Sequence, residues 1–199
     1  MTWLFGLGLM ILTQVEAQTG VSVKTDVAYF AGGCFWCMES DFEKLPGVIT
    51  VTSGYTGGKE INPSYEEVSG QRTSHAEAVE VVYNTARLSY EQLLDYYWHH
   101  VDPLTPNAQF CDHGPQYRSA IFYRNTAELQ AILKAKGKYE KQLGKAIVTQ
   151  IVSAGPFYLA EEYHQDYYQK NPLRYRYYRT VCGRDARLQE IWGTDAPVH

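Results

Sequence analysis

Two cysteines, Cys34 and Cys37, stand three positions apart in the stretch "GGCFWCMES" of residues 32–40, with two aromatic residues between them. Three kinds of chemistry use such a pair: a zinc site, a disulfide exchanger, and a reactive thiol with a partner thiol that resolves its oxidised form. Residues three apart on a helix are neighbours, which brings the two sulfur atoms within reach of a disulfide. The spacing is compatible with all three kinds of chemistry, so the choice among them depends on the rest of the sequence.

Zinc is disfavoured because a structural site needs four ligands and this pair supplies two. Cys111 and Cys182 lie far along the chain, and neither a second C-x2-C nor an H-x3-H completes a set. A thioredoxin-like disulfide exchanger also begins with a strand followed by C-x-x-C, and this chain has that start. Such a fold would not explain the aromatic and acidic loops further along. We therefore favour Cys34 as a nucleophile with Cys37 as its resolving thiol, and we keep the disulfide exchanger as the alternative function.

The reactive thiol is expected at the start of a helix. An apolar strand candidate at 27–30 runs into Gly32 and Gly33, and helical spacing of apolar residues begins at Cys34, with positions 35, 38, 42 and 45. A thiol in this place lies against the positive end of the helix dipole, which lowers its pKa. The two glycines lack side chains, so we expect a tight turn and close approach of a substrate to the sulfur.

The remaining elements alternate between strands and helices. Alternating apolar residues predict strands at 48–55, 75–83, 116–123 and 146–152. Helices are predicted at 89–100, capped by Ser89, at 126–143, capped by Thr126, and at 160–170. Residues 101–115 are expected to form a long loop, and residues after 170 an aromatic, irregular tail. The interspersed pattern predicts an α+β fold, a two-layer sandwich of a mixed or antiparallel sheet with helices packed on it and long coil segments.

The bulk composition limits the classes of partner. The chain has 199 residues, 45% of them hydrophobic, which is enough for the core of a single domain, expected at residues 18–199. Its formal net charge is -4, and the one basic cluster, "RYRYYR" at 174–179, is expected to be a solvated strand or tail. A nucleic-acid partner is therefore not expected. Neither G-x-G-x-x-G nor a P-loop occurs, so no nucleotide cofactor is predicted, and no metal either.

The N-terminus resembles an export signal. Residues 3–12 are apolar, too short a run to span a bilayer, and the small residues Val15 and Ala17 fit an A-x-A-like cleavage site. No Lys or Arg follows Met1, so the usual positive start is missing. We expect residues 1–17 to be a signal peptide and the mature chain to begin near Gln18. The processed protein would then be periplasmic or secreted without stable membrane insertion; without a true signal it would be cytoplasmic.

Five motifs in order resemble one known family, the A-type peptide methionine sulfoxide reductases. They span nearly all of residues 27–182 and are "GGCFWCMES", "GVITVTSGYTGG", "NPSYEEVSGQRTSHAEAV", "QFCDHGPQYRSAIF" and "AEEYHQDYYQKNP". The resemblance implies a two-layer α+β sandwich with extensive coil, in agreement with the predicted elements. It also implies an enzyme that reduces the S epimer of methionine sulfoxide, free or in proteins, to methionine, and so repairs oxidative damage.

The resemblance assigns the reacting groups. Cys34 matches the nucleophile, Phe35 and Trp36 match the aromatic wall for the substrate methyl group, and Glu77 in "HAEAV" matches the acid. A sulfoxide sulfur is a poor electrophile, and its oxygen has to gain a proton before it can leave. A carboxyl group held protonated by an apolar surround can supply that proton, because desolvation raises the pKa of an acid. Attack by Cys34 then releases methionine and leaves a sulfenic acid.

Three further residues match the groups that support this acid. Tyr65 in "NPSY" and Tyr117 in "QYRS" match hydroxyl donors to the sulfoxide oxygen, and Asp112 in "CDHG" matches a carboxylate behind the reacting groups. Residue type alone says little here, because the chain has 17 tyrosines. The assignment of these three depends on the family motifs.

The resolving thiol is where this chain departs from some family members, which carry Gly at the position of Cys37 and place recycling cysteines in a glycine-rich C-terminal tail. Cys37 is expected to resolve first, because loop closure favours the near partner. Cys182 is expected to be a second resolver in a relay or a bystander, and Cys111 to be structural. The family implies recycling by thioredoxin or a thioredoxin-like reductant, which for an exported copy means an oxidoreductase domain outside the cytoplasm. We expect a monomer.

Overall fold

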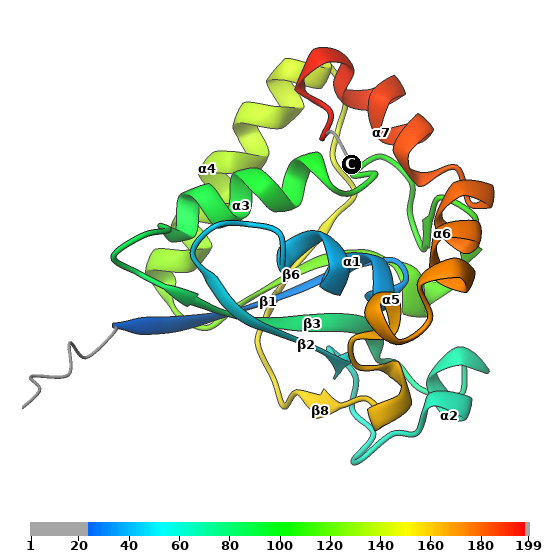
Figure 1. The fold of residues 1–199 in the computed structure, drawn as a ribbon. Helices are drawn as coiled ribbons and strands as arrows, with labels where there is room; N and C mark the ends of the chain where they lie inside the picture. The colour runs from blue at the N-terminus through cyan, green and yellow to red at the C-terminus, as the bar shows by residue number, and fades with distance from the viewer. Residues whose placement is uncertain (1–23, 198–199) are drawn as a thin grey trace, which may run out of the picture.

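The structure, a computed structural model, describes residues 24–197 and contains a six-stranded mixed sheet (Figure 1). The strand order is β7-β6-β1-β3-β2-β8, and every neighbouring pair is antiparallel except the parallel pair β6 and β7. The six strands are β1 Thr25–Gly32, β2 Val48–Thr56, β3 Ala76–Asn84, β6 Ser119–Tyr123, β7 Gln150–Ser153 and β8 Tyr158–Leu159. The α+β prediction is confirmed; the expected signal peptide lies outside the described residues.

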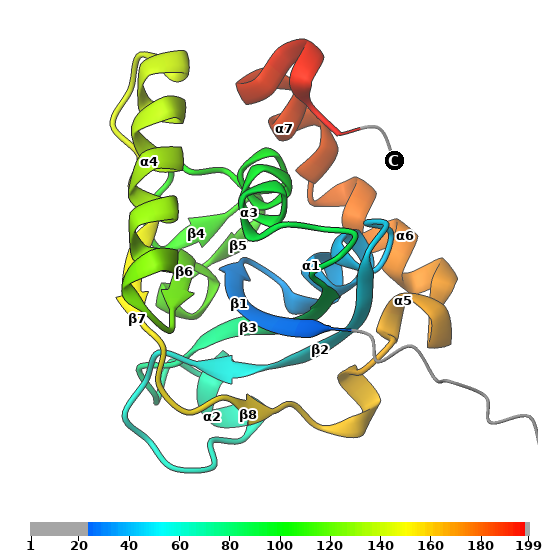
Figure 2. The ribbon, with the colours of Figure 1, turned by 90° about the vertical axis from the view of Figure 1, so that its left-hand side faces the viewer.

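Helices α1, α3 and α4 lie on one side of this sheet, with α1 against β2 and β3 and α4 beside α3 (Figures 1 and 2). A small separate sheet pairs β4 Ala108–Gln109 with β5 Asp112–His113. No helix among residues 24–197 combines the length and the apolar character needed to cross a membrane. The α-helices are α1 Phe35–Phe42, α2 Tyr65–Ser69, α3 Tyr90–His99, α4 Thr126–Leu143, α5 Tyr167–Lys170, α6 Pro172–Val181 and α7 Arg184–Trp192.

Side-chain alternation along the central strands decides what faces the helices. Phe30 of β1 and Val79 of β3 belong to the main core, which lies between the sheet and the helices. Ala31 and Ala78, their neighbours, belong to a smaller core on the opposite face. Because successive side chains of a strand point to opposite faces, Glu77 lies on the same face as Val79. The register of β3 therefore places Glu77 on the face that α1 covers.

The caps of two helices show where sequence patterns are decisive and where they are not. Ser89 caps α3 as predicted, and its side chain accepts a hydrogen bond from the backbone N–H of Gln92. The cap of α4 is Asn125 rather than Thr126, because the Asn125 side chain accepts from the backbone N–H of Glu128 at 3.0 Å. Thr126 is the first residue of the helix. Adjacent Asn and Thr are both good caps, and the hydrogen-bond geometry chooses between them.

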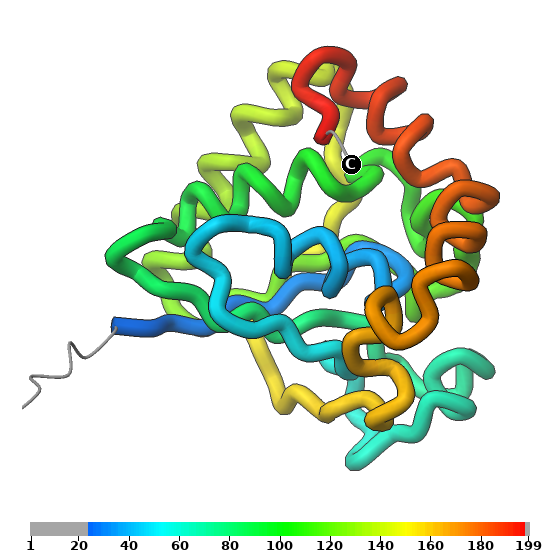
Figure 3. Tube along the Cα trace, viewed as in Figure 1, coloured from blue at the N-terminus to red at the C-terminus, as the bar shows by residue number. Residues whose placement is uncertain are grey.

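The chain after residue 170 is helical, which corrects the expectation of an irregular tail. Figure 3 shows α6 and α7, in orange to red, running along one side of the molecule toward the end of α4. Pro172 lies in the first turn of α6, where a missing backbone N–H costs nothing. Tyr175 and Arg179, four residues apart on the same helix, are both buried. The "RYRYYR" segment is therefore a packed helix, and the expectation of a solvated strand or tail was wrong.

Two other predicted elements differ in extent. The strand expected at 146–152 begins only at Gln150. The helix expected at 160–170 is divided into a 3-10 turn at Glu162–His164 and the short α5. Asp166 interrupts it, because its backbone is left-handed with φ 53° and its N–H donates to a Glu39 oxygen at 3.0 Å. A contact made across the fold thus overrides the local helical pattern.

The turn from β1 into α1 depends on Gly33. Its φ is +86°, in the region that favours glycine, which confirms the expected tight turn. A Cβ added at Gly33 would lie 2.6 Å from the Cβ of Gln109. The space beside this glycine is therefore filled by Gln109, which corrects the expectation that it leaves room for a substrate.

Replacing Gly33 with Ala is expected to lower the free energy of unfolding by about 1–3 kcal/mol, from backbone strain and the clash with Gln109. Gly137→Ala in α4 is the matched control, since nothing lies within 4 Å of its added Cβ. That control should raise the free energy of unfolding by about 0.5–1 kcal/mol, as usual in a helix interior. Denaturant unfolding measures both; an unchanged midpoint for Gly33→Ala would contradict the role given to this turn.

Candidate active site

Seven residues predicted from separate motifs line one small cavity of about 80 Å³. Cys34 lies in it directly before α1, and the residue is only 7% exposed. An eighth lining residue, Tyr178 of α6, was not predicted. The cavity-lining residues are Cys34, Phe35, Trp36, Tyr65, Glu77, Asp112, Tyr117 and Tyr178. The two candidate resolving cysteines, Cys37 and Cys182, are not among them.

Glu77 of β3 lies beneath the first turn of α1. Its Oε2 accepts a hydrogen bond from the backbone N–H of Phe35 at 3.1 Å, and the residue is 2% exposed. Burial raises the pKa of Glu77 to about 8; the Phe35 N–H opposes this shift, and the negative charge of Asp112 adds to it. Glu77 is therefore largely protonated at neutral pH and can donate a proton into the cavity.

The Cys34 thiol does not have the lowered pKa that its place at a helix start predicts. Burial raises the pKa of Cys34, and its hydrogen bond to Cys37 raises it further. In the same pair the pKa of Cys37 is lowered, first by the hydrogen bond from Cys34 and then by the nearby Arg184 and Arg179. The pKa values of the two thiols therefore move apart, so Cys37 loses its proton before Cys34 does. Desolvation outweighs the dipole of the short helix α1.

Cys37 is buried one helical turn after Cys34, against the C-terminal helices. It is 2% exposed and packs with Tyr167 of α5 and Tyr175 of α6. Arg179 donates to Asp41 at 2.9 Å and to the Tyr175 hydroxyl at 3.2 Å. The positive charges near Cys37 are therefore carried by the part of the chain that was expected to be irregular.

The two tyrosines that were predicted to be hydroxyl donors come from different turns. Tyr65 is the first residue of α2, and its backbone N–H donates to Glu161 at 2.9 Å. Tyr117 ends the 3-10 turn Pro115–Tyr117. Burial, followed by the charge of Glu77, raises the pKa of Tyr65 to about 12, and the pKa of Tyr117 rises for the same two reasons. Both hydroxyls stay protonated and can donate hydrogen bonds in the cavity.

Two residues that orient Trp36 were missed in the sequence. The indole N–H of Trp36 donates to Nδ1 of His164 at 3.0 Å. The Trp36 ring also stacks on Tyr167, with centroids 3.7 Å apart and planes 6° apart. The ring of Tyr65 lies 4.3 Å from that of His164. The signal for both residues was present in "AEEYHQDYYQK", but tyrosine and histidine are too common as packing residues for type alone to identify them.

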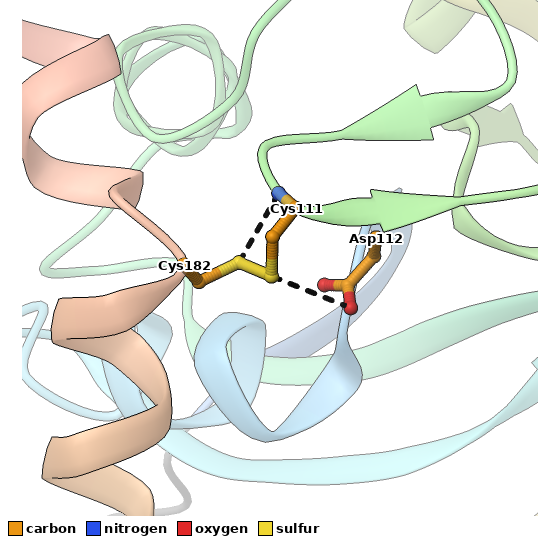
Figure 4. Close-up of side chains that lie close together, drawn as sticks. All are labelled: Cys111, Asp112 and Cys182. Atoms are coloured by element: carbon orange, nitrogen blue, oxygen red, sulfur yellow. Dashed lines mark hydrogen bonds between the residues drawn. A yellow bond between two sulfur atoms is a disulfide. The ribbon is translucent and has the colours of Figure 1, made fainter.

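Asp112 lies beside a disulfide that was not predicted. Cys111 and Cys182 are bonded, so the thiol expected to be structural and the thiol expected to resolve are partners (Figure 4). The Asp112 carboxylate accepts a hydrogen bond from the Tyr178 hydroxyl. Burial raises the pKa of Asp112, and the hydrogen bond from Tyr178 opposes that shift. Cys34 and Cys37, in contrast, are free thiols.

One acidic cluster lies close to α1, outside the cavity. Carboxylate oxygens of Glu39, Glu43 and Asp166 lie within 4.8 Å of one another. Both Glu39 oxygens already accept hydrogen bonds, from Ser53 Oγ at 2.9 Å and from the Asp166 N–H at 3.0 Å. Burial raises the pKa of Glu39 to about 7. These contacts connect α1 to β2 and to the start of α5. They give the acidic cluster a structural role that requires no metal ion.

The cavity combines a nucleophilic sulfur with protonated oxygen groups. Cys34 can attack a soft electrophilic centre, and Glu77, Tyr65 and Tyr117 can donate protons or hydrogen bonds to an oxygen on that centre. The aromatic walls suit a small apolar substituent. A substrate that carries an oxygen on a soft atom next to a methyl-sized group fits this arrangement.

Comparisons with known proteins agree with this chemistry. A family model described as "Peptide methionine sulfoxide reductase" matches residues 26–196. A curated relative from Caulobacter vibrioides, peptide methionine sulfoxide reductase MsrA 2, is 48% identical over 191 residues, covering 96% of each chain. The solved structure of Mxr1 from Saccharomyces cerevisiae in reduced form has a TM-score of 0.72 and 35% identity, covering 76% of this chain and 88% of that one. The structure of Mxr1 in complex with Trx2 has a TM-score of 0.53 and 25% identity, covering 76% and 91%.

Proposed function

The chain belongs to the peptide methionine sulfoxide reductase family, and from that membership we propose how its own residues reduce methionine sulfoxide to methionine. The observation that carries the proposal is the meeting of Cys34 and the protonated Glu77 in one cavity. A thiol alone would react slowly, because the sulfoxide oxygen leaves only after it is protonated. Cys34 is the nucleophile and Glu77 the acid.

The first step forms a bond between Cys34 Sγ and the sulfoxide sulfur. Cys37 accepts the Cys34 proton across their hydrogen bond, which makes Cys34 a thiolate at the moment of attack. Glu77 gives its proton to the sulfoxide oxygen, and Tyr65 and Tyr117 donate hydrogen bonds to it. The oxygen moves to Cys34, so methionine leaves and Cys34 becomes a sulfenic acid. The sulfoxide is reduced and Cys34 is oxidised by the same two electrons.

The aromatic groups supply specificity in this proposal. Phe35 and Trp36 form a wall for the substrate methyl group, and His164 with Tyr167 holds the Trp36 ring in place. Only one epimer of the sulfoxide can put its methyl group on that wall and its oxygen toward Glu77 at the same time. The family resemblance makes this the S epimer.

Cys37 then resolves the sulfenic acid. Its sulfur attacks Cys34 Sγ, a disulfide forms, and the sulfenic hydroxyl group takes the proton from Cys37 and leaves as water. Its place one turn along α1 and the positive charges of Arg179 and Arg184 support this role.

Asp112 acts behind the reacting groups by raising the pKa of Glu77 through its charge.

Cys182 is the second resolver in this proposal. Its thiolate attacks Cys37 Sγ and releases Cys34, and Cys111 then attacks Cys182 Sγ and releases Cys37. This relay ends with a disulfide between Cys111 and Cys182 and with Cys34 and Cys37 as free thiols. The structure has the same arrangement. Cys111 is exposed, so a dithiol reductant reaches the outer bond more easily than the buried pair.

The reductant we propose is thioredoxin or a thioredoxin-like protein, as the complex of the related Mxr1 with Trx2 supports. The alternative of a thioredoxin-like exchanger has no support in the family match, which covers residues 26–196. Repair of oxidised methionine in proteins follows from the activity. Export of the chain and a monomeric state stay predictions.

Glu77→Gln is expected to slow methionine release by about 10²- to 10³-fold, the usual contribution of a general acid. In the wild type, kcat/KM should fall above pH about 8 as Glu77 loses its proton, and this decline should be absent in Glu77→Gln. Glu80→Gln on the same strand is the matched control and should keep the wild-type profile. A decline above pH 8 that persists in Glu77→Gln would remove Glu77 from the acid role.

The relay predicts how much methionine one chain releases without a reductant. A chain whose four cysteines are all reduced should release two methionines, because each disulfide stores two electrons. Cys182→Ser should release one, and so should a wild-type chain that begins with the Cys111–Cys182 bond formed. Chromatographic counting of methionine per chain measures this. One methionine from the fully reduced wild type, equal to the count from Cys182→Ser, would show that the outer pair takes no part in turnover.

A further inference from the structure

Tyr178 of α6 reaches the cavity although no motif predicts it. Its hydroxyl donates to the Asp112 carboxylate, and its ring stands edge-on to Trp36, with centroids 6.0 Å and planes 79° apart. The adjacent Tyr177 is 72% exposed. Tyr178 therefore faces the cavity, whereas Tyr177 on the same helix faces solvent.

The Tyr178–Asp112 contact joins segments 66 residues apart in the chain, so α6 has to stay against β5 for the contact to exist. The disulfide connects the same two segments. Cys111 directly precedes Asp112, and Cys182 follows Tyr178 by one helical turn. The backbone N–H of Cys111 also donates to Cys182 Sγ at 3.2 Å (Figure 4). A covalent link so close to the contact keeps the two partners at high effective concentration.

The link and the contact differ in exposure. Cys111 is exposed and Cys182 is half-buried, whereas Asp112 and Tyr178 line the cavity. A dithiol can therefore reduce the Cys111–Cys182 bond to two thiols, itself becoming a disulfide, without entering the cavity. A change made at the surface then reaches the wall of the substrate site.

We propose that Tyr178 is a positioning residue that fixes Asp112 at the sulfoxide cavity, and that the Cys111–Cys182 bond holds Tyr178 there. This inference rests on the proposed function. With the bond formed, the cavity wall is assembled before substrate arrives. With the bond open, α6 and β5 have to be brought together on binding, which weakens affinity for the sulfoxide. The groups that react are unchanged, so the rate of the chemical step stays nearly the same. The redox state of the outer cysteines thus sets substrate affinity as well as carrying electrons.

The test measures methionine release in a single turnover, with enzyme in excess, in which neither Cys111 nor Cys182 is needed. Peptide mapping first confirms the outer bond. Tyr178→Phe, which keeps the ring and loses the hydroxyl, should raise the half-saturating sulfoxide concentration about tenfold, the usual effect of losing a hydrogen bond to a charged group. The maximal rate should change less than about twofold. Tyr177→Phe on the same helix should behave as wild type.

The double variant Cys111→Ser with Cys182→Ser should raise the half-saturating concentration to a similar degree. Adding Tyr178→Phe to it should have little further effect, because both changes act through one contact. Purely additive effects, or a Tyr178→Phe that matches Tyr177→Phe, would overturn the inference. If the double serine variant does not fold, the comparison of Tyr178→Phe with Tyr177→Phe decides. A wild type that releases no methionine would instead refute the proposed function.

Discussion

The site depends on the hydrogen bond between the backbone N–H of Phe35 and the carboxyl group of Glu77, buried between α1 and β3. It places the proposed acid directly under the first turn of α1, the helix that follows Cys34. Burial there keeps Glu77 protonated, although the N–H alone would favour the charged form. The same burial raises the pKa of Cys34, so in the proposed mechanism Cys37 has to take the proton of Cys34. One buried interface between a helix and a strand therefore sets the pKa of both the proposed acid and the proposed nucleophile.

Much of this site is predictable from the sequence, because its motifs lie at the ends of regular elements. Period-two alternation along β3 places Glu77 on the helix face, and the apolar stripe that begins at Cys34 locates the start of α1. The sequence pattern does not predict pKa values, which depend on how much water the whole fold excludes. A helix-dipole argument gave the wrong direction for Cys34 because α1 is short and its start is fully enclosed.

The C-terminal part of the chain shows the opposite case. Its mix of tyrosine and arginine has no clear hydrophobic periodicity, so α6 and α7 were not predicted. Their stability comes from contacts across the fold: Arg179 with Asp41, and Arg184 with the backbone carbonyl of His100 at 2.7 Å. The pairing of Cys111 with Cys182 was not predictable for the same reason. The C-terminal segment, which was expected only to pack on the sheet, supplies the positive charges around Cys37. It also supplies Cys182, whose disulfide lies beside Asp112.

The central claim is that Cys34 attacks and Cys37 resolves, and the most direct test is to locate the first disulfide. Reduced Cys182→Ser protein, in which the outward relay is blocked, receives one equivalent of methionine sulfoxide; free thiols are then alkylated and the peptides weighed. We predict a bond between Cys34 and Cys37, with Cys111 alkylated. Cys37 alkylated while Cys34 carries a sulfenic acid or a bond to Cys111 would contradict the account.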